Sequence, residues 1–289
     1  MGPRKLYRLR LPSRVLRLGE RTLLMGVLNV TPDSFSDGGA YFTAAQAVAH
    51  ALEMERAGAD ILDIGGESTR PGSEGISAAE ELGRILPVLQ ALRGRLGIPI
   101  SIDTQKAGVA DAAIRNGAEI VNDVSALRSD PRLGEVVRHA RVPIVLMHMR
   151  GKPRTMQKLP FARDVMRDVT SGLRQAIARA EQAGIPKKQI ILDPGIGFGK
   201  SAEQNCELLA RLPELTRLGC ALAVGTSRKT FIGVCLGSKE KPLPPQERIW
   251  GTAATVAAAI LGGAHIIRAH DVAEMAQVAR MADAIRAAS

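Results

Sequence analysis

The chain has 289 residues, of which 45% are hydrophobic and 24% are charged, so it can bury a large core and is neither disordered nor collagen-like. No apolar run reaches the roughly 18 residues that a membrane-spanning helix needs. The net charge of +10 raises nucleic-acid binding as an alternative, but only 3% of the residues are aromatic and residues 1–21 alone contribute +6 of the charge.

The first 21 residues form a basic extension. Seven Arg or Lys residues stand against a single acidic residue, Glu20, and five apolar residues are spaced among them. This pattern predicts a short amphipathic hairpin, which we interpret as a solvated flap over residues 1–21 rather than as a targeting or RNA-binding arm. The apolar residues are Leu6, Leu9, Leu11, Val15 and Leu18.

From Thr22 onward, eight short apolar runs alternate with longer stretches of helical spacing. Helix-start signals precede several of these stretches, as at Ser77, Asp130 and Ser201. Apolar runs without polar alternation are typical of parallel strands covered on both faces. The predicted strands are residues 23–28, 60–64, 99–102, 119–121, 143–147, 189–192, 220–224 and 265–267.

A weak internal repeat supports the same alternation. Gly58, Gly117 and Gly263 each stand where a predicted helix ends and the next strand begins, a position that favours glycine. Eight β/α units close a barrel, so the sequence predicts an α/β fold with a single (β/α)8 TIM barrel over residues 22–289. A doubly wound open sheet is the alternative, but the glycine-rich phosphate loop that it requires does not follow the first strand.

Polar residues follow every predicted strand, at the end where a β/α barrel carries its reactive groups. Each one alone could simply cap the next helix, but eight in eight strands favour a functional site. In chain order they are Asn29, Asp63, Asp103, Asn122, His148, Asp193, the turn Ser227-Arg228-Lys229, and Arg268 with His270.

Two kinds of chemistry are represented at these strand ends. Arg268 and His270 precede a helix N-terminus at Asp271, a combination that suits an anion such as phosphate. Carboxylates at the ends of apolar strands need donors, and a fused heterocycle with adjacent N–H groups would supply them to Asp103 or Asp193. A salt bridge between Asp193 and Lys229 inside the barrel mouth is the alternative.

Three loops also carry signals. Residues 194–201 resemble a phosphate loop, but the spacing of their glycines fails the Walker pattern, and we expect them to pass under a flat ligand with Phe198 available for stacking. Residues 29–41 and 65–76 exceed the usual length of a β/α connection and are predicted lids.

The three cysteines, Cys206, Cys220 and Cys235, lack zinc-ligand spacing, and we interpret them as thiols of a reducing cytoplasm.

Eight stretches, in order, closely resemble the dihydropteroate synthase family. They are N-V-T-P-D-S-F-S-D-G-G (29–39), D-I-G-G-E-S-T-R-P-G (63–72), S-I-D-T (101–104), V-N-D-V (121–124), L-M-H-M (146–149), D-P-G-I-G-F-G-K (193–200), S-R-K (227–229) and R-A-H-D (268–271). The resemblance implies a sulfonamide-targeted homodimer in folate biosynthesis. It would join 4-aminobenzoate to the methylene of a dihydropterin diphosphate, with Mg²⁺, and release pyrophosphate.

The resemblance also assigns residues. Catalysis would rest on Lys229, Asp103, Asp193, Arg268 and His270, and Asn29 would bind the metal. Pterin would be held by Asp103, Asn122, Asp193 and Lys229 with Met147, Gly197 and Phe198. The aminobenzoate pocket and its lids would be formed by Phe35, Ser36, Asp37, Ser68, Thr69, Arg70, Pro71 and Thr230, and Asp63 joins the substrate-binding set.

Two other functions are considered. A methyltetrahydrofolate-binding barrel that serves a corrinoid partner would share Asp103, Asn122 and Asp193 but has no use for Arg268 or His270. A pterin- or anion-binding module without turnover is disfavoured by the two predicted lids.

Overall fold

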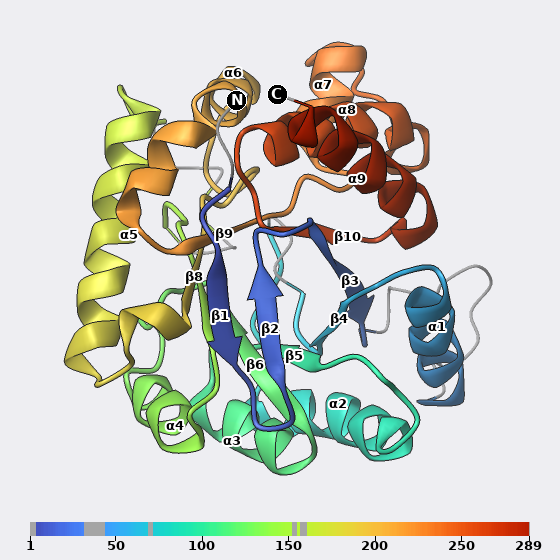
Figure 1. Cartoon of the computed structure of the whole chain (residues 1–289), viewed down its shortest axis with the longest axis vertical. Coiled ribbons are helices and arrows are strands. Elements are labelled where there is room, and N and C mark those ends of the chain that lie inside the picture. The colour runs from blue at the N-terminus through green and yellow to red at the C-terminus, as the bar shows by residue number, and fades with distance from the viewer. Residues whose placement is uncertain (1–3, 32–43, 69–71, 152–154, 157–160, 289) are drawn as a thin grey trace.

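The computed structural model describes residues 4–31, 44–68, 72–151, 155–156 and 161–288. Eight parallel strands close into a barrel in chain order, with the last strand pairing with the first, which confirms the predicted fold class (Figure 1). All eight predicted strands are present. They are β3 (Leu23–Asn29), β4 (Ile61–Gly65), β5 (Ile100–Asp103), β6 (Ala118–Asp123), β7 (Ile144–Met147), β8 (Ile190–Asp193), β9 (Ala221–Val224) and β10 (Ile266–Ala269).

Helices surround the barrel (Figure 1). They are α1 (Ala44–Arg56), α2 (Ala78–Leu92), α3 (Ala107–Arg115), α4 (Arg132–Ala140), α5 (Val165–Gln182), α6 (Ala202–Ala210), α7 (Thr230–Leu236), α8 (Ile249–Leu261) and α9 (Val272–Ala287). Short 3-10 helices are η2 (Lys187–Gln189), η3 (Leu212–Leu218) and η4 (Pro245–Glu247). None of the helices described is long and apolar enough to cross a membrane.

The helix ends follow the sequence signals. Ser77 caps α2 by accepting a hydrogen bond from the backbone N–H of Glu80 at 3.1 Å. The reciprocal capping box forms at α6, between Ser201 and Gln204. Gly58, Gly117 and Gly263 have φ angles of 104°, 103° and 102°, so the repeated glycine does occupy the left-handed position that other residues avoid.

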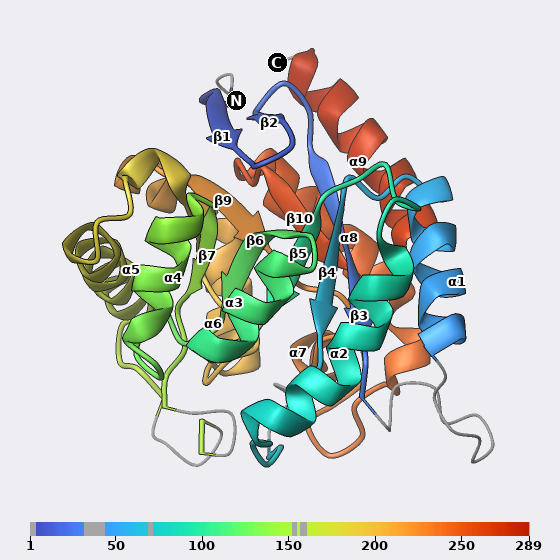
Figure 2. The ribbon, with the colours of Figure 1, turned by 90° about the horizontal axis from the view of Figure 1, so that it is seen from below.

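The N-terminal hairpin closes one end of the barrel. Strands β1 (Tyr7–Arg10) and β2 (Val15–Leu18) pair antiparallel and lie across that end in both views (Figures 1 and 2). Leu9 and Leu18 are fully buried, in a cluster with the inward side chains near the start of the barrel strands. The hairpin was predicted, but the interpretation as a solvated flap is wrong, because Leu9, Leu11 and Leu18 are buried against the barrel interior.

Polar contacts fasten this hairpin in place. Arg4 donates to Thr22 Oγ1 at 2.9 Å and pairs with Asp283 of the C-terminal helix. Ser13 donates from its backbone N–H and its hydroxyl to Glu119, at 2.7 and 2.9 Å. Two basic residues of the extension, Arg4 and Arg21, are therefore paired with acidic residues of the barrel, Asp283 and Asp60.

Two of the three cysteines lie close together, although they are widely spaced in the sequence. Cys206 and Cys235 are 29 residues apart, yet their sulfur atoms lie 3.8 Å apart between α6 and α7. All three cysteines are free thiols.

Leu18→Ala is expected to lower the free energy of unfolding by about 2–5 kcal/mol, because a fully buried leucine leaves a cavity. Val15→Ala on the same strand is the matched control, since Val15 is 50% exposed and should change stability by less than about 0.5 kcal/mol. Urea unfolding followed by circular dichroism measures both variants. Equal stabilities for the two would show that the hairpin is not seated on the barrel in solution.

Candidate active site

A small cavity opens at the mouth formed by the carboxyl ends of the strands. Its volume is about 50 Å³, and its walls come from β3, β6, β7, β8, β9, β10 and the loops that follow them. The sequence-predicted residues that line it are Asn122, Met147, Asp193, Phe198, Lys229, Arg268 and His270. Asn122 and His270 thus line one cavity although 148 positions separate them in the sequence. They do so because every parallel strand ends at the same rim.

Arg268 is the centre of an ion-pair network in this mouth. Its Nε donates to Asp63 Oδ2 at 2.6 Å, and one terminal nitrogen donates to Asp103 Oδ2 at 2.8 Å. Asn122 adds a bond from Nδ2 to the same Asp63 oxygen at 3.0 Å. Asp63 is fully buried, so its geometry suits a residue that positions Arg268 and Asn122.

One guanidinium between two carboxylates leaves an excess of negative charge. Burial raises the pKa of Asp103 to about 7, and the neighbouring Asp63 adds to this effect against the attraction of Arg268. The pKa of Arg268 stays above its ordinary value: burial opposes the charged form, but the charges of Asp63 and Asp103 outweigh it. The second oxygen of Asp63, Oδ1, is buried without a hydrogen-bond partner. The network therefore has acceptor capacity that Arg268 and Asn122 do not use.

Lys229 lines the same cavity. Its Nζ lies 4.1 Å from the centroid of the Phe198 ring, in a cation–π contact. Burial lowers the pKa of Lys229 to about 8, with Arg268 acting in the same direction. Among the described ion pairs none joins Lys229 to Asp193, so the alternative of a salt bridge between them does not occur. Asp193 instead accepts from the Gly195 N–H at 2.7 Å, and burial raises its pKa.

The turn that carries Lys229 is held in an unusual conformation. Arg228 has φ 58°, a left-handed value that is rare for a residue with a side chain. Its Nε donates to Asp271 Oδ2 at 3.0 Å, and its carbonyl accepts from Arg248 Nη1 at 2.8 Å. Arg248 belongs to the proline-rich 238–248 stretch, so this loop supports the turn.

The glycine-rich loop is fastened by a residue that the sequence analysis did not single out. Lys200 is 4% exposed, and its ammonium donates to the carbonyls of Gly195 at 2.8 Å, Phe198 at 3.1 Å and His148 at 3.4 Å. Burial lowers the pKa of Lys200 to about 7. A Cβ at Gly195 would lie 1.9 Å from the His148 carbonyl oxygen, so only glycine fits there. In the sequence, Lys200 was marked only as the last residue of the 193–200 stretch that resembles the family.

His270 and Ser227 form the edge nearest to α9. Ser227 Oγ and His270 Nδ1 are 2.9 Å apart, and the backbone N–H of His270 donates to the same oxygen at 3.2 Å. Burial, with the charges of Arg268 and Arg228, lowers the pKa of His270 to about 3. The imidazole is therefore neutral, beside a cationic Arg268, and it can donate a hydrogen bond to an anion.

Four further predicted residues are described but are not among those that line the cavity. A Cβ at Gly65 would lie 3.4 Å from Asp103 Cβ and 3.8 Å from Asn29 Oδ1, so Asn29 lies beside Asp103. Gly197, with φ 84°, packs under the aliphatic part of Lys229. Thr230, the first residue of α7, is exposed, and Ser68 is half-buried. Phe35, Ser36, Asp37, Thr69, Arg70 and Pro71 lie outside the described residues.

His148 is the exception among the strand-end residues. It lines a different cavity, on the outer side of β7 against α5, and Met147 is common to both cavities. His148 follows the last residue of β7, and its Nε2 lies 3.5 Å from Asp168 Oδ2 of α5.

Comparisons with known proteins agree with this geometry. The model of the pterin binding enzyme family matches residues 25–270. A dihydropteroate synthase from Synechocystis sp. is 51% identical over 267 residues, which cover 92% of this chain and 91% of that protein. The relative from Bacillus subtilis is 47% identical over 266 residues, covering 92% of this chain and 89% of that protein.

Solved structures are similar over the whole barrel. The dihydropteroate synthase of Xanthomonas albilineans with 4-aminobenzoic acid has a TM-score of 0.90 and 43% identity, covering 98% of this chain and 99% of that one. The Yersinia pestis enzyme with a sulfonamide drug has a TM-score of 0.90 and 42% identity, covering 98% and 100%. The chain therefore belongs to the pterin-binding enzyme family, among the dihydropteroate synthases.

Proposed function

We propose that this chain condenses 4-aminobenzoate with (7,8-dihydropterin-6-yl)methyl diphosphate, giving 7,8-dihydropteroate and pyrophosphate. The observation that carries the proposal is the meeting of two sets of groups at one cavity. Hydrogen-bonding groups for a heterocycle, on Asn122 and Asp193, and cationic or donor groups for an anion, on Arg268 and His270, share its wall. Relatives bind the corresponding molecules: the Xanthomonas albilineans enzyme is solved with 4-aminobenzoic acid and with 7,8-dihydropteroate.

The carboxylates and the amide are proposed to hold the pterin ring. Asp193 presents an oxygen at the end of β8, and a ring N–H with an exocyclic amine would donate to it in a bidentate manner. Asn122 supplies both a donor and an acceptor. Lys229 and Phe198 lie together at the side of the ring, where the ammonium would donate to a ring acceptor. Met147 and Gly197 complete the pterin pocket.

Arg268 is the group that we expect to change partners when substrate binds, because it now pairs with two carboxylates at the cavity. A diphosphate beside His270 competes for the guanidinium, since phosphate oxygens accept the same bidentate fork. Asp103 would then be released to accept from the pterin. For Asp63 we now propose a role in positioning Arg268 and not in direct substrate contact, because it is fully buried and accepts from Arg268 Nε.

The chemical step is proposed to be dissociative. The C–O bond to the diphosphate breaks, its electron pair leaves on oxygen, and the pterin methylene becomes cationic. Arg268 and His270 stabilise the charge on the departing oxygens, and the carboxylates of Asp103 and Asp193 stabilise the cation, so each set acts where charge develops. The amine nitrogen of 4-aminobenzoate then forms the new C–N bond and loses a proton.

The aminobenzoate pocket is proposed to form from the two predicted lids, residues 29–41 and 65–76, together with Thr230. Ser68 and the six lid residues outside the described ranges would contribute to it. Closure of this pocket would exclude water, which otherwise captures the cation.

Mg²⁺ is the proposed metal, and the donor set fits it. Across the described residues, no three His, Cys, Asp or Glu side chains are grouped as ligands for a dedicated metal centre. Mg²⁺ commonly takes only one or two protein oxygens and completes its shell with water and substrate phosphates. Asn29 Oδ1, beside Asp103, is the proposed protein ligand. When bound, the ion would neutralise charge on the diphosphate.

The proposal extends to organisation and location. Residues 1–21 would be an extension that closes the barrel, and residues 22–289 its single catalytic domain. The chain is proposed to be a cytoplasmic homodimer. In support, Leu236 of α7 and Trp250 of α8 are 52% and 80% exposed, which leaves apolar surface for a second copy, and the free thiols suit a reducing compartment.

The proposed reaction is tested by pyrophosphate release with and without 4-aminobenzoate. Release should depend on both substrates in the wild type and fall by about 100- to 1,000-fold or more in Lys229→Ala and Asp193→Asn, because each removes a group that acts on the developing charge. Lys239→Ala is the control, since Lys239 is exposed in the 238–248 stretch. Near-normal rates in the first two variants, with the fold intact, would contradict the site assignment.

Arg268 variants test the anion role. Arg268→Lys keeps the positive charge between Asp63 and Asp103 but loses the bidentate fork, so it should weaken binding of the diphosphate substrate more than binding of free pterin. Arg268→Ala leaves two buried carboxylates uncompensated and should in addition destabilise the fold by about 3–5 kcal/mol. Calorimetric titration with both ligands measures the ratio. Equal losses for the two ligands in Arg268→Lys would exclude the anion role.

The pH dependence follows from Lys229. Its pKa of about 8 means that the ammonium is present below this pH and is lost as the pH rises through it. Pterin affinity should therefore decline above pH 8. Asp103, Asp193 and Arg268 also face this group, so Lys229→Arg is the informative comparison, because a guanidinium stays charged throughout. An identical alkaline decline in Lys229→Arg would assign the titration to another group.

A further inference from the structure

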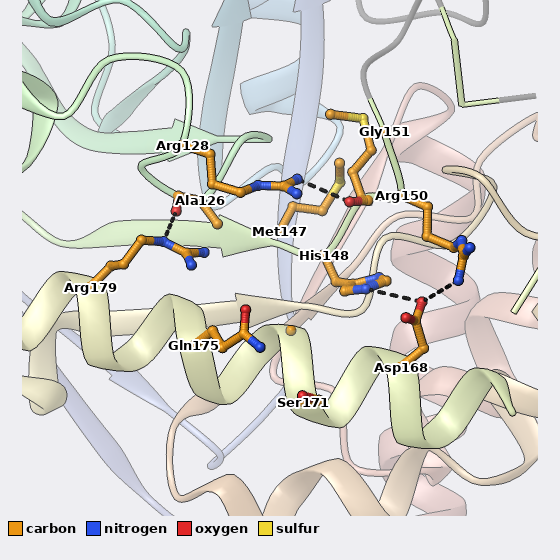
Figure 3. A pocket seen from close by; sticks show the side chains of 12 residues that line it. Ala126, Arg128, Met147, His148, Arg150, Gly151, Asp168, Ser171, Gln175 and Arg179 are labelled. Atoms are coloured by element: carbon orange, nitrogen blue, oxygen red, sulfur yellow. Dashed lines mark hydrogen bonds and ion pairs between the residues drawn. The ribbon is translucent and has the colours of Figure 1, made fainter. Parts of the chain in front are cut away.

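A second and larger cavity lies outside the barrel mouth. Its volume is about 330 Å³, and it is bounded by the loop after β6, the end of β7 with the loop that follows it, and residues 168–179 of α5 (Figure 3). The functional site described above uses none of its charged residues. The charged or titratable residues that line it are Arg128, His148, Arg150, Asp168 and Arg179.

Two of the guanidinium groups are fixed from behind. Arg128 donates through Nε to the Ser125 carbonyl at 2.8 Å and through Nη2 to the Met149 carbonyl at 2.9 Å. Arg179 donates through Nε to the Ala126 carbonyl at 3.0 Å. These contacts hold each side chain in place but leave Arg128 Nη1 and both terminal nitrogens of Arg179 without a hydrogen bond to another described residue. Figure 3 shows Arg128 on the loop after β6 and Arg179 on α5, both on the side of the cavity away from Arg150 and Asp168.

The two cations are close enough to oppose each other. Burial lowers the pKa of Arg179, and the charge of Arg128 lowers it further. The charge of the nearby Asp123 carboxylate offsets part of this repulsion, but its described hydrogen bonds come from the backbone N–H groups of Ser125 and Leu127, at 2.8 and 2.6 Å, and not from either arginine. Adjacent guanidinium groups with unused donors are the arrangement that binds oxyanions in proteins.

The remaining groups leave the cavity positive. Asp168 is the one carboxylate in its described lining, and it lies 3.3 Å from Arg150 Nη1 and 3.5 Å from His148 Nε2. His148 is uncharged, because burial and the charges of Lys200, Arg128 and Arg150 hold its pKa far below the usual value. Its Nδ1 is buried without a partner, in a side chain that is 8% exposed. Three arginines thus face one carboxylate.

We propose that this cavity binds a phosphate-type oxyanion, such as inorganic phosphate or diphosphate, at a site separate from Arg268 and His270. The free nitrogens of Arg128 and Arg179 would hold the anion between them. A volume of about 330 Å³ accommodates either anion with water. The inference does not depend on the proposed reaction, because it concerns charges on the outer side of β7.

Titration calorimetry with inorganic pyrophosphate on the full chain tests the site. The wild type should bind two equivalents. Arg128→Gln/Arg179→Gln should lose one of them, with an affinity at least about tenfold weaker, and Arg268→Lys should weaken the other. Arg174→Gln is the matched control, since Arg174 is an exposed arginine of the same helix outside the cavity. A parallel titration with inorganic phosphate shows which of the two anions the site prefers.

A second variant guards against a folding defect, because the double substitution also removes three hydrogen bonds to backbone carbonyls. Gln175→Glu adds a carboxylate to the cavity wall at an exposed position of α5 and leaves every arginine in place. It should also abolish the second equivalent. Pyrophosphate binding that keeps the wild-type stoichiometry in Gln175→Glu and in the folded double variant, whether that is one equivalent or two, would overturn the proposal. Loss of catalytic activity alone would bear on the proposed reaction and not on this site.

Discussion

The charge balance of the barrel mouth depends on one half-buried guanidinium that is shared by two carboxylates. Arg268 joins Asp63 and Asp103 across the mouth of the barrel, and so connects the last strand with the second and third of the eight. Two carboxylates this close are stable only with a cation between them, and the cation is stable in a buried place only with both of them. A diphosphate that takes over the guanidinium therefore changes the charge balance of the whole mouth, which couples the anion side of the site to the pterin side.

The two ends of the barrel divide the tasks of stability and function. At one end, aliphatic side chains of the hairpin and the strands form a continuous apolar cluster. At the other end, buried polar groups are only partly satisfied, as the unpartnered Asp63 Oδ1 and the raised pKa of Asp103 indicate. Such groups are costly unless a ligand completes them. The apolar end and the helical layer supply the stability that this polar mouth requires.

Backbone geometry around the mouth is constrained by residues that do not touch the proposed substrates. Lys200 gathers three carbonyls of the loop beneath Phe198, and Arg228 is kept left-handed by Asp271 and Arg248. Both arrangements place a side chain that the site needs, Phe198 in one case and Lys229 in the other. The outer cavity beside His148 lies directly behind this framework, because the His148 N–H donates to the Asp193 carbonyl at 2.9 Å.

The sequence by itself determined the barrel, its eight strands and the rim on which the polar residues lie, because these follow from hydrophobic period, helix caps and the common direction of parallel strands. It also determined that Arg268, His270, Asn122 and Asp193 meet. Only the tertiary structure decided which groups pair: Arg268 with Asp63 and Asp103 rather than Lys229 with Asp193, His148 outward, Lys200 on carbonyls, and the hairpin leucines inward. Pairing depends on distances of a few ångströms between residues remote in sequence, and spacing along a chain does not contain that information.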